Sequence, residues 1–126
     1  MTDAFVAALT HSYSDVREVW LFGSRANGEA NLNSDWDYWV FADTASLETL
    51  RADTELRRLS TDANIDLFVI YDGDQFVNPW SHKKKDGSLS DWKWTRQSER
   101  QATYRANKWD RGVKSKTCRA QRKWPD

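Results

Sequence analysis

The sequence predicts an α/β (α+β) fold, with one small mixed sheet, helices packed on one side of it, and added strands near the C-terminus. Apolar segments typical of strands alternate with segments of helical periodicity between residues 3 and 71, which is the pattern of helices packed on a sheet. Two of the strand segments contain aspartates. After residue 82 the chain becomes basic and rich in tryptophan, and its apolar residues alternate with polar ones as in strands.

The first two predicted elements are a helix over residues 3–12 and a strand over residues 17–22. Phe5, Val6 and Leu9 recur at a spacing that places them on one helical face. The strand is a short, mostly apolar run that ends at a turn.

This turn is Gly23-Ser24, which leaves the strand toward a helical turn. Such a turn presents backbone N–H groups to a phosphate, and the missing side chain of Gly23 lets the phosphate come close. Arg25 follows directly. Its guanidinium could offer a phosphate a planar fork of donors, or it could be an ordinary surface arginine.

Ten residues later, Asp35-Trp36-Asp37 opens a second strand segment that continues through residues 38–41. Residues two apart in a strand project from the same face, roughly 7 Å apart, so both carboxylates could address one divalent-metal cluster. Asp35 alone would also suit a turn with a role like that of a helix cap. Asp37 favours a site, because aspartate is unfavourable inside a strand without a reason.

The next predicted elements are an amphipathic helix beginning near Thr44 and a strand over residues 64–70. Apolar residues recur at multiples of three through the charged helical stretch, at Leu47, Leu50, Leu56 and Leu59. The strand contains Asp66, to which the argument from strand preference applies again. If the strands that carry the aspartates are central neighbours, Asp35, Asp37 and Asp66 come together.

Turn and strand signals continue beyond residue 70. Residues 71–74 predict a turn with solvated carboxylates, and Asp86-Gly87 is a dipeptide typical of hairpin turns. The region with Leu89, Trp92 and Trp94 that follows favours an added strand, of which Trp92 and Trp94 would form one buried face. Residues 101–107 also alternate and favour a strand, whereas residues 98–101 could instead cap a helix.

With 126 residues and no internal repeat, the chain is expected to form one compact domain. No run approaches the roughly 18 apolar residues of a membrane helix, and the first residues lack the basic start of a signal peptide, so we expect a cytoplasmic protein without a membrane partner. Cys118 is the single cysteine, which excludes an internal disulfide, and is expected to be an ordinary tail residue. His11 and His82 match no metal-binding spacing and are expected at the surface.

The Gly-Ser turn, the Asp35-x-Asp37 pair after ten residues and Asp66 about thirty residues further on resemble the motif of the DNA polymerase beta-type nucleotidyltransferase superfamily, in its minimal stand-alone form. The resemblance covers roughly residues 16–71 and implies the small mixed sheet of that family. It also implies a reaction in which a nucleoside monophosphate moves from a nucleoside triphosphate, with ATP the expected donor, to a hydroxyl acceptor.

The resemblance further implies roles for the site residues. Asp35 and Asp37 would bind Mg²⁺, and two ions about 3.5–4 Å apart would clamp the triphosphate and the attacking oxygen during turnover. Asp66 would hold the ion nearest the nucleophile or accept the hydroxyl proton. Gly23 and Ser24 would hold the β and γ phosphates.

Charge is divided between two parts, which we treat as a nucleotidyltransferase core (residues 1–82) and a C-terminal extension packed on the same domain (residues 83–126). The core carries five Lys or Arg against fourteen Asp or Glu, a formal charge of −9, and the extension carries fourteen against five, or +9. Five of the eight tryptophans lie in or beside the extension, at Trp80, Trp92, Trp94, Trp109 and Trp124. Such residues could bind RNA or a nucleotide, cover the sheet, or neutralise the acidic half of this or a neighbouring chain.

Three functions from different classes stay open, and the first ranks ahead. An active nucleotidyltransferase would modify a hydroxyl of a protein, an RNA or a small molecule. An antitoxin-type protein would bind or adenylylate a HEPN-type toxin, as the resemblance to minimal family members implies. A catalytically silent module would bind a nucleotide or a nucleic acid.

Overall fold

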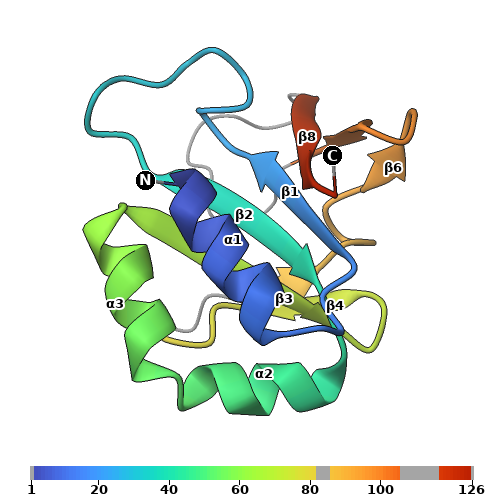
Figure 1. Cartoon of the computed structure of the whole chain (residues 1–126). Coiled ribbons are helices and arrows are strands. Elements are labelled where there is room, and N and C mark those ends of the chain that lie inside the picture. Colours follow the sequence, from blue (N-terminus) through green and yellow to red (C-terminus); the bar gives the residue numbers. More distant parts are fainter. Residues whose placement is uncertain (1, 82–85, 106–116, 126) are drawn as a thin grey trace.

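The structure is a computed structural model that describes residues 2–81, 86–105 and 117–125 (Figure 1). These residues form three helices and an eight-stranded sheet. The elements are α1 (Thr2–Ser12), β1 (Glu18–Phe22), β2 (Trp36–Phe41), α2 (Thr44–Arg51), α3 (Thr54–Asp62), β3 (Ile65–Tyr71), β4 (Gln75–Val77), β5 (Asp86–Ser88), β6 (Thr95–Arg96), β7 (Gln101–Tyr104) and β8 (Cys118–Trp124). The strand order is β5-β4-β3-β2-β1-β8-β7-β6, in which β2 and β3 are parallel and the other neighbours are antiparallel.

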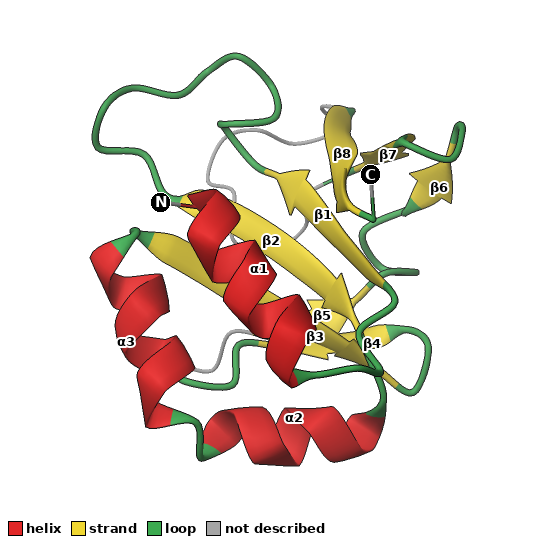
Figure 2. Ribbon diagram, in the orientation of Figure 1, coloured by secondary structure: helices red, strands yellow, loops and turns green. Residues whose placement is uncertain are grey.

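The described helices lie together on one side of the sheet (Figure 2). Because side chains alternate along a strand, every second residue of the central strands points to this side. Most of these residues are aliphatic, and they pack against apolar helical residues such as Leu9 and Leu50. We call this side the helix face; its sheet residues are Val19, Leu21, Tyr38, Val40, Leu67 and Val69.

The opposite side of the same strands is aromatic. Phe22 stacks on Trp39 with ring centroids 3.7 Å apart, and Trp39 meets Trp92 edge-on at 5.7 Å. The cover on this side comes from the C-terminal part of the chain, through the turn that contains Trp92 and through β7 and β8 at the curled end of the sheet. We call this side the aromatic face; its residues on β1, β2 and β3 are Trp20, Phe22, Trp39, Phe41, Phe68 and Ile70.

The helix predicted to begin near Thr44 is interrupted, so the prediction of one continuous helix is wrong. α2 ends at Arg51, and α3 begins at Thr54. Asp53 caps the second helix: its carboxylate accepts the Leu56 N–H at 3.0 Å and the Tyr13 hydroxyl at 2.7 Å. The break cannot be recognised from the spacing of the leucines, because both helices pack their leucines on the same sheet.

The hairpin turn predicted at Asp86-Gly87 is also wrong. Both residues lie in β5 and pair with β4, where Gly87 is opposite Phe76. A Cβ atom at Gly87 would lie 2.8 Å from the Phe76 ring, so packing rather than a turn requires the glycine. The connection between the two strands includes residues 82–85, which lie outside the described part of the chain.

The strand predicted from Leu89, Trp92 and Trp94 is a turn instead, in which Lys93 has a positive φ of 57°. The turn nevertheless buries Trp92 and half-buries Trp94 against the aromatic face, because it folds both indoles back onto the sheet. Further along, β7 lies where the alternation of residues 101–107 predicts a strand; residues 106 and 107 fall outside the described residues.

Cys118 differs from the expected tail residue, since it is buried in β8 opposite Tyr104. His11 is exposed at the end of α1, as expected, and His82 lies outside the described residues. No helix in the described ranges is long and apolar enough to cross a membrane.

Candidate functional site

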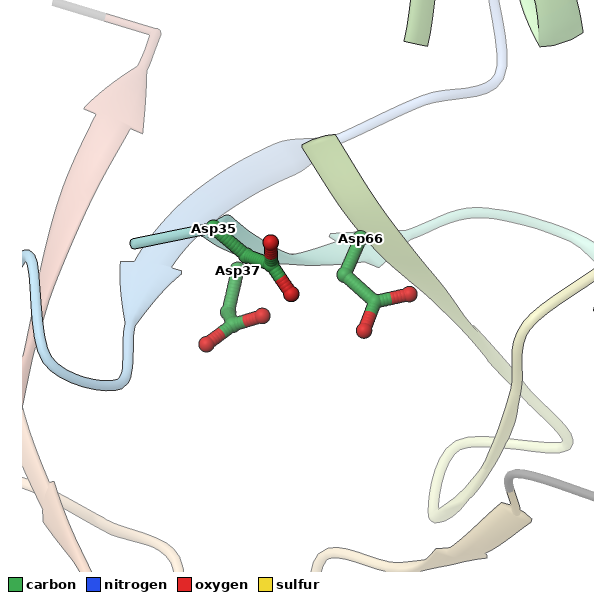
Figure 3. Close-up of side chains that lie close together, drawn as sticks. All are labelled: Asp35, Asp37 and Asp66. Atoms are coloured by element: carbon green, nitrogen blue, oxygen red, sulfur yellow. The ribbon is translucent and has the colours of Figure 1, made fainter. Parts of the chain in front are cut away.

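The three aspartates meet at one end of the parallel strand pair (Figure 3). Asp37 of β2 lies directly opposite Asp66 of β3 in the sheet register, and Asp35 immediately precedes β2. One carboxylate oxygen of each lies within 4.8 Å of those of the other two. Asp35 is exposed, and the other two are half-buried.

The alternation of side chains explains why the carboxylates share a side. Asp37 is two residues before Trp39, and Asp66 is two residues before Phe68, so both project from the aromatic face. The parallel register then places them side by side. The carboxylates thus occupy the end of the aromatic face, where the rings stop and solvent begins.

Three carboxylates at this spacing repel one another when ionised, and a bound cation would relieve that repulsion. Carboxylate oxygens are hard donors that suit Mg²⁺, Ca²⁺ or Mn²⁺, whereas softer ions prefer sulfur or imidazole ligands. Among the described residues this is the one group of three potential metal ligands. The donor set therefore fits a hard divalent cation.

Gly23 stands directly against this group because the register of β1 and β2 pairs Phe22 with Asp37. Its φ of +76° is left-handed, and a Cβ atom there would lie 2.2 Å from the Asp37 Oδ2 atom. Any other residue would therefore be strained and would displace the carboxylate. Gly23 is needed for the position of Asp37, a reason that the sequence does not reveal.

The hydrogen-bond donors of the Gly-Ser turn differ in whether they already have an acceptor. The Gly23 N–H donates to the Tyr104 hydroxyl at 2.8 Å. By contrast, neither the backbone N–H nor the hydroxyl of Ser24 bonds to any residue that the structure describes. Burial raises the pKa of the Tyr104 phenol well above its usual value, and the nearby Cys118 and Asp37 add to this effect, so the phenol is neutral at physiological pH.

Arg25 is half-buried, and its guanidinium is engaged within the described part of the chain. Its Nε and Nη2 atoms donate to the Ser34 carbonyl at 3.3 and 3.0 Å. Its guanidinium lies over the Trp36 ring, 4.4 Å from the ring centroid. Arg25 therefore ties the loop that follows the Gly-Ser turn to the start of β2, and its role as a phosphate ligand stays a prediction.

One residue that the sequence did not single out holds a carboxylate in place. The Asn78 side-chain amide donates to Asp66 Oδ1 at 2.7 Å, and its own oxygen accepts the Trp80 backbone N–H at 2.9 Å. The Trp80 indole in turn donates to the Leu50 carbonyl at 2.6 Å. The Asn-Pro pair is visible as a turn signal, but its proximity to Asp66 depends on the pairing of β3 with β4.

Comparison with known proteins adds to this geometry. The family model described as Polymerase beta, Nucleotidyltransferase matches residues 6–80, more than half of the chain. The match includes the Gly-Ser turn and all three aspartates of the site, and it confirms the resemblance seen in the sequence. A search among curated proteins found no match to this chain.

Proposed function

The chain belongs to the polymerase beta nucleotidyltransferase family, and from this premise we propose that it is a divalent-metal-dependent enzyme that transfers a nucleoside monophosphate from a nucleoside triphosphate to a hydroxyl group. The observation that carries the proposal is the convergence of Asp35, Asp37 and Asp66 within 4.8 Å beside the turn at Gly23. A metal site next to backbone and hydroxyl donors is what transfer from a triphosphate requires.

In this proposal Asp35, Asp37 and Asp66 hold the cations, with Mg²⁺ as the expected ion and two ions during turnover. When bound, the cations neutralise the triphosphate and activate the attacking hydroxyl. Gly23 keeps Asp37 in position by leaving room for its carboxylate, and Asn78 fixes one oxygen of Asp66.

Ser24 is proposed as the principal phosphate donor of the turn. Its hydroxyl and backbone N–H have no hydrogen-bond acceptor within the described part of the chain, whereas the Gly23 N–H already donates to Tyr104. Gly23 would contribute chiefly its missing side chain, which lets a phosphate approach the backbone. Arg25 would add positive charge next to this turn.

The proposed reaction forms a bond between the acceptor oxygen and the α-phosphorus of the triphosphate, which we expect to be that of ATP. The bond from the α-phosphorus to the bridging oxygen breaks, and pyrophosphate leaves. The proton of the acceptor hydroxyl passes to Asp66 or to water. Asp66→Asn separates these roles of Asp66, because the amide keeps the shape of the side chain but cannot accept the proton.

A labelling experiment tests the proposal. The purified protein is incubated with Mg²⁺, cell lysate and each nucleoside triphosphate labelled at the α-phosphate. We expect a labelled macromolecule with the parent and with Asp62→Ala, a surface control on α3, but not with Asp35→Ala. Digestion of the product shows whether the acceptor is a protein, such as a HEPN-type partner, or RNA.

If no nucleotide labels any acceptor, binding of the triphosphate decides what remains. Magnesium-dependent binding without transfer would favour a silent nucleotide-binding module over an enzyme. Absence of both transfer and binding would refute the proposed function.

A further inference from the structure

Tyr104 of β7 links the C-terminal part of the chain to the candidate site. Its hydroxyl accepts the Gly23 N–H at 2.8 Å, and its side chain is almost completely buried. The ring is held by other aromatic residues: it lies edge-on to Phe22 at 5.8 Å and to Trp39 at 5.1 Å, and nearly parallel to Trp92 at 6.0 Å. The position of the hydroxyl is therefore fixed by the packing of the aromatic face.

The same turn has a second connection, to β8. The Asn27 side-chain amide donates to the Arg119 carbonyl at 3.1 Å, and its oxygen accepts the Arg119 N–H at 2.8 Å. The amide thus pairs with both backbone groups of Arg119, as a neighbouring strand would. It also donates to the Gly23 carbonyl at 2.9 Å, so it holds the two ends of the turn together.

From these contacts we infer that Tyr104 and Asn27 are positioning residues for the proposed nucleotidyl transfer. In this inference β7 and β8 hold in place the Gly-Ser turn of the nucleotide site. Both strands lie outside the residues that the family model matches. The inference rests on the proposed function, because it names what holds the turn that would bind the triphosphate.

The contacts act on two groups of the site at once. Gly23 packs directly against the Asp37 carboxylate, so a shift of Gly23 would change the position that this carboxylate can adopt. Ser24 lies between the two anchors at Gly23 and Asn27, and its direction toward a phosphate depends on both. Loss of either anchor should therefore weaken binding of the metal–triphosphate complex before it unfolds the protein.

Tyr104→Phe tests this inference, with Tyr13→Phe as a matched control. Each substitution removes one hydroxyl from a buried tyrosine and keeps the ring. The Tyr13 hydroxyl donates to Asp53 at 2.7 Å, and Tyr13 packs in the core of the helix face, on the opposite side of the sheet from the carboxylates. A purely structural role of Tyr104 would make the two variants alike.

Two measurements are made on each variant: the hydrogen-exchange rate of the Gly23 amide by NMR, and the affinity for Mg²⁺ with a nonhydrolysable ATP analogue by calorimetry. For Tyr104→Phe we expect exchange about tenfold faster and affinity lower by roughly threefold to tenfold, the effect of one lost hydrogen bond. Both values should stay at the parental level in Tyr13→Phe.

The inference is overturned if Tyr104→Phe keeps the parental affinity, or if Tyr13→Phe lowers affinity equally. A parent that does not bind the analogue would refute the proposed function instead. In that case the exchange rate still decides the anchoring itself: faster exchange at Gly23 only in Tyr104→Phe supports it, and parental exchange contradicts it.

Discussion

The two faces of the central sheet are built from the same strands but from different kinds of residue. β1 places Val19 and Leu21 on the helix face and Trp20 and Phe22 on the aromatic face. Aliphatic side chains fit the grooves of packed helices, which can be filled by many combinations of similar volume. Stacked and edge-on rings pack with stricter geometry than aliphatic side chains. The aromatic face therefore fixes the positions of the residues around it more closely than the helix face does.

The candidate site belongs to the aromatic face. Asp37 and Asp66 continue the rows of Trp39 and Phe68 on their strands, and Tyr104 reaches the Gly-Ser turn from the cover of this face. A change on the helix face should therefore cost stability alone. A change on the aromatic face should cost stability and also alter the site.

The largest effect is expected at the end of the aromatic face. Asp35→Ala and Asp37→Ala each remove a metal ligand and should lower kcat/KM about five-thousandfold, which corresponds to a loss of about 5 kcal/mol of transition-state stabilisation. Without metal the variants should melt no lower than the parent, because like-charge repulsion is relieved. Turnover with labelled triphosphate and thermal melting with and without Mg²⁺ test both statements.

The matched control is Asp62→Ala, which removes an exposed carboxylate that is paired with Arg58 on α3. It should keep the parental turnover and shift stability little. Normal turnover in Asp37→Ala would exclude that carboxylate from the site and separate the site from the aromatic face.

Equivalent truncations of the two cores compare the faces directly. Trp92→Ala on the aromatic face should lower the free energy of unfolding by about 3–5 kcal/mol, and Leu9→Ala on the helix face by about 2–5 kcal/mol. Both residues are buried. At a temperature where both variants are folded, only Trp92→Ala should weaken nucleotide affinity, because Trp92 packs against Phe22 and Tyr104.

Chemical denaturation gives the stabilities, and calorimetry with the ATP analogue gives the affinities. Equal losses of affinity in the two variants would show that the faces do not differ in their effect on the site. A Trp92→Ala variant as stable as the parent would instead make this indole a free binding platform and strengthen the nucleic-acid interpretation of the C-terminal extension.

An intermediate effect is expected where the chain supports Asp66. Asn78→Ala removes the amide that donates to Asp66 Oδ1, and loss of such a supporting residue typically costs tenfold to a hundredfold in metal affinity or activity. Titration with Mn²⁺ as the probe, at a temperature where the variant is folded, should show weaker binding. Asn33→Ala, an exposed asparagine in the loop before β2, is the control and should bind Mn²⁺ as the parent does.

The sequence predicts the carboxylates of the site better than it predicts the residues that hold the site in place. Asp37 and Asp66 can be recognised as site candidates from the sequence, because aspartate is unfavourable inside an apolar strand. The alternation of side chains also predicts the face of the strand on which each lies. Their direct pairing depends on the strand order, which came from the family resemblance. The contact of Tyr104 with Gly23 joins residues 81 positions apart, and no local pattern indicates it.

The errors in the predicted fold have local causes. Asp53 is a recognisable helix cap, but the regular leucines on both sides of it favour one helix, because both helices pack on the same sheet. Asp86-Gly87 is a hairpin signal by composition, yet Phe76 requires a residue without a side chain opposite it. Packing across the β4–β5 pair overrides the local signal there.

The smallest expected effect compares ion pairs at the two faces. Burial raises the pKa of Glu18, but hydrogen bonds from Arg96 and Trp20 outweigh it and hold that pKa below its usual 4.5. Arg96 in turn lies over the rings of Trp20 and Phe41 at the edge of the aromatic face. Because the folded-state pKa is lowered, this stabilisation is present above pH 4.5 and is lost as the pH falls through the lowered value.

Glu18→Gln should therefore lower the free energy of unfolding by less than about 1 kcal/mol near neutral pH and flatten its decline in acid. Glu55 of α3 also has a lowered pKa, caused by its hydrogen bond with Arg58, but this pair is exposed to solvent, so Glu55→Gln should flatten the decline less. Denaturant titrations between neutral and acidic pH measure both slopes. If Glu55→Gln changed the slope as much as Glu18→Gln, the rings around Arg96 would add nothing to the ion pair, and the difference between the faces would not extend to their charged edges.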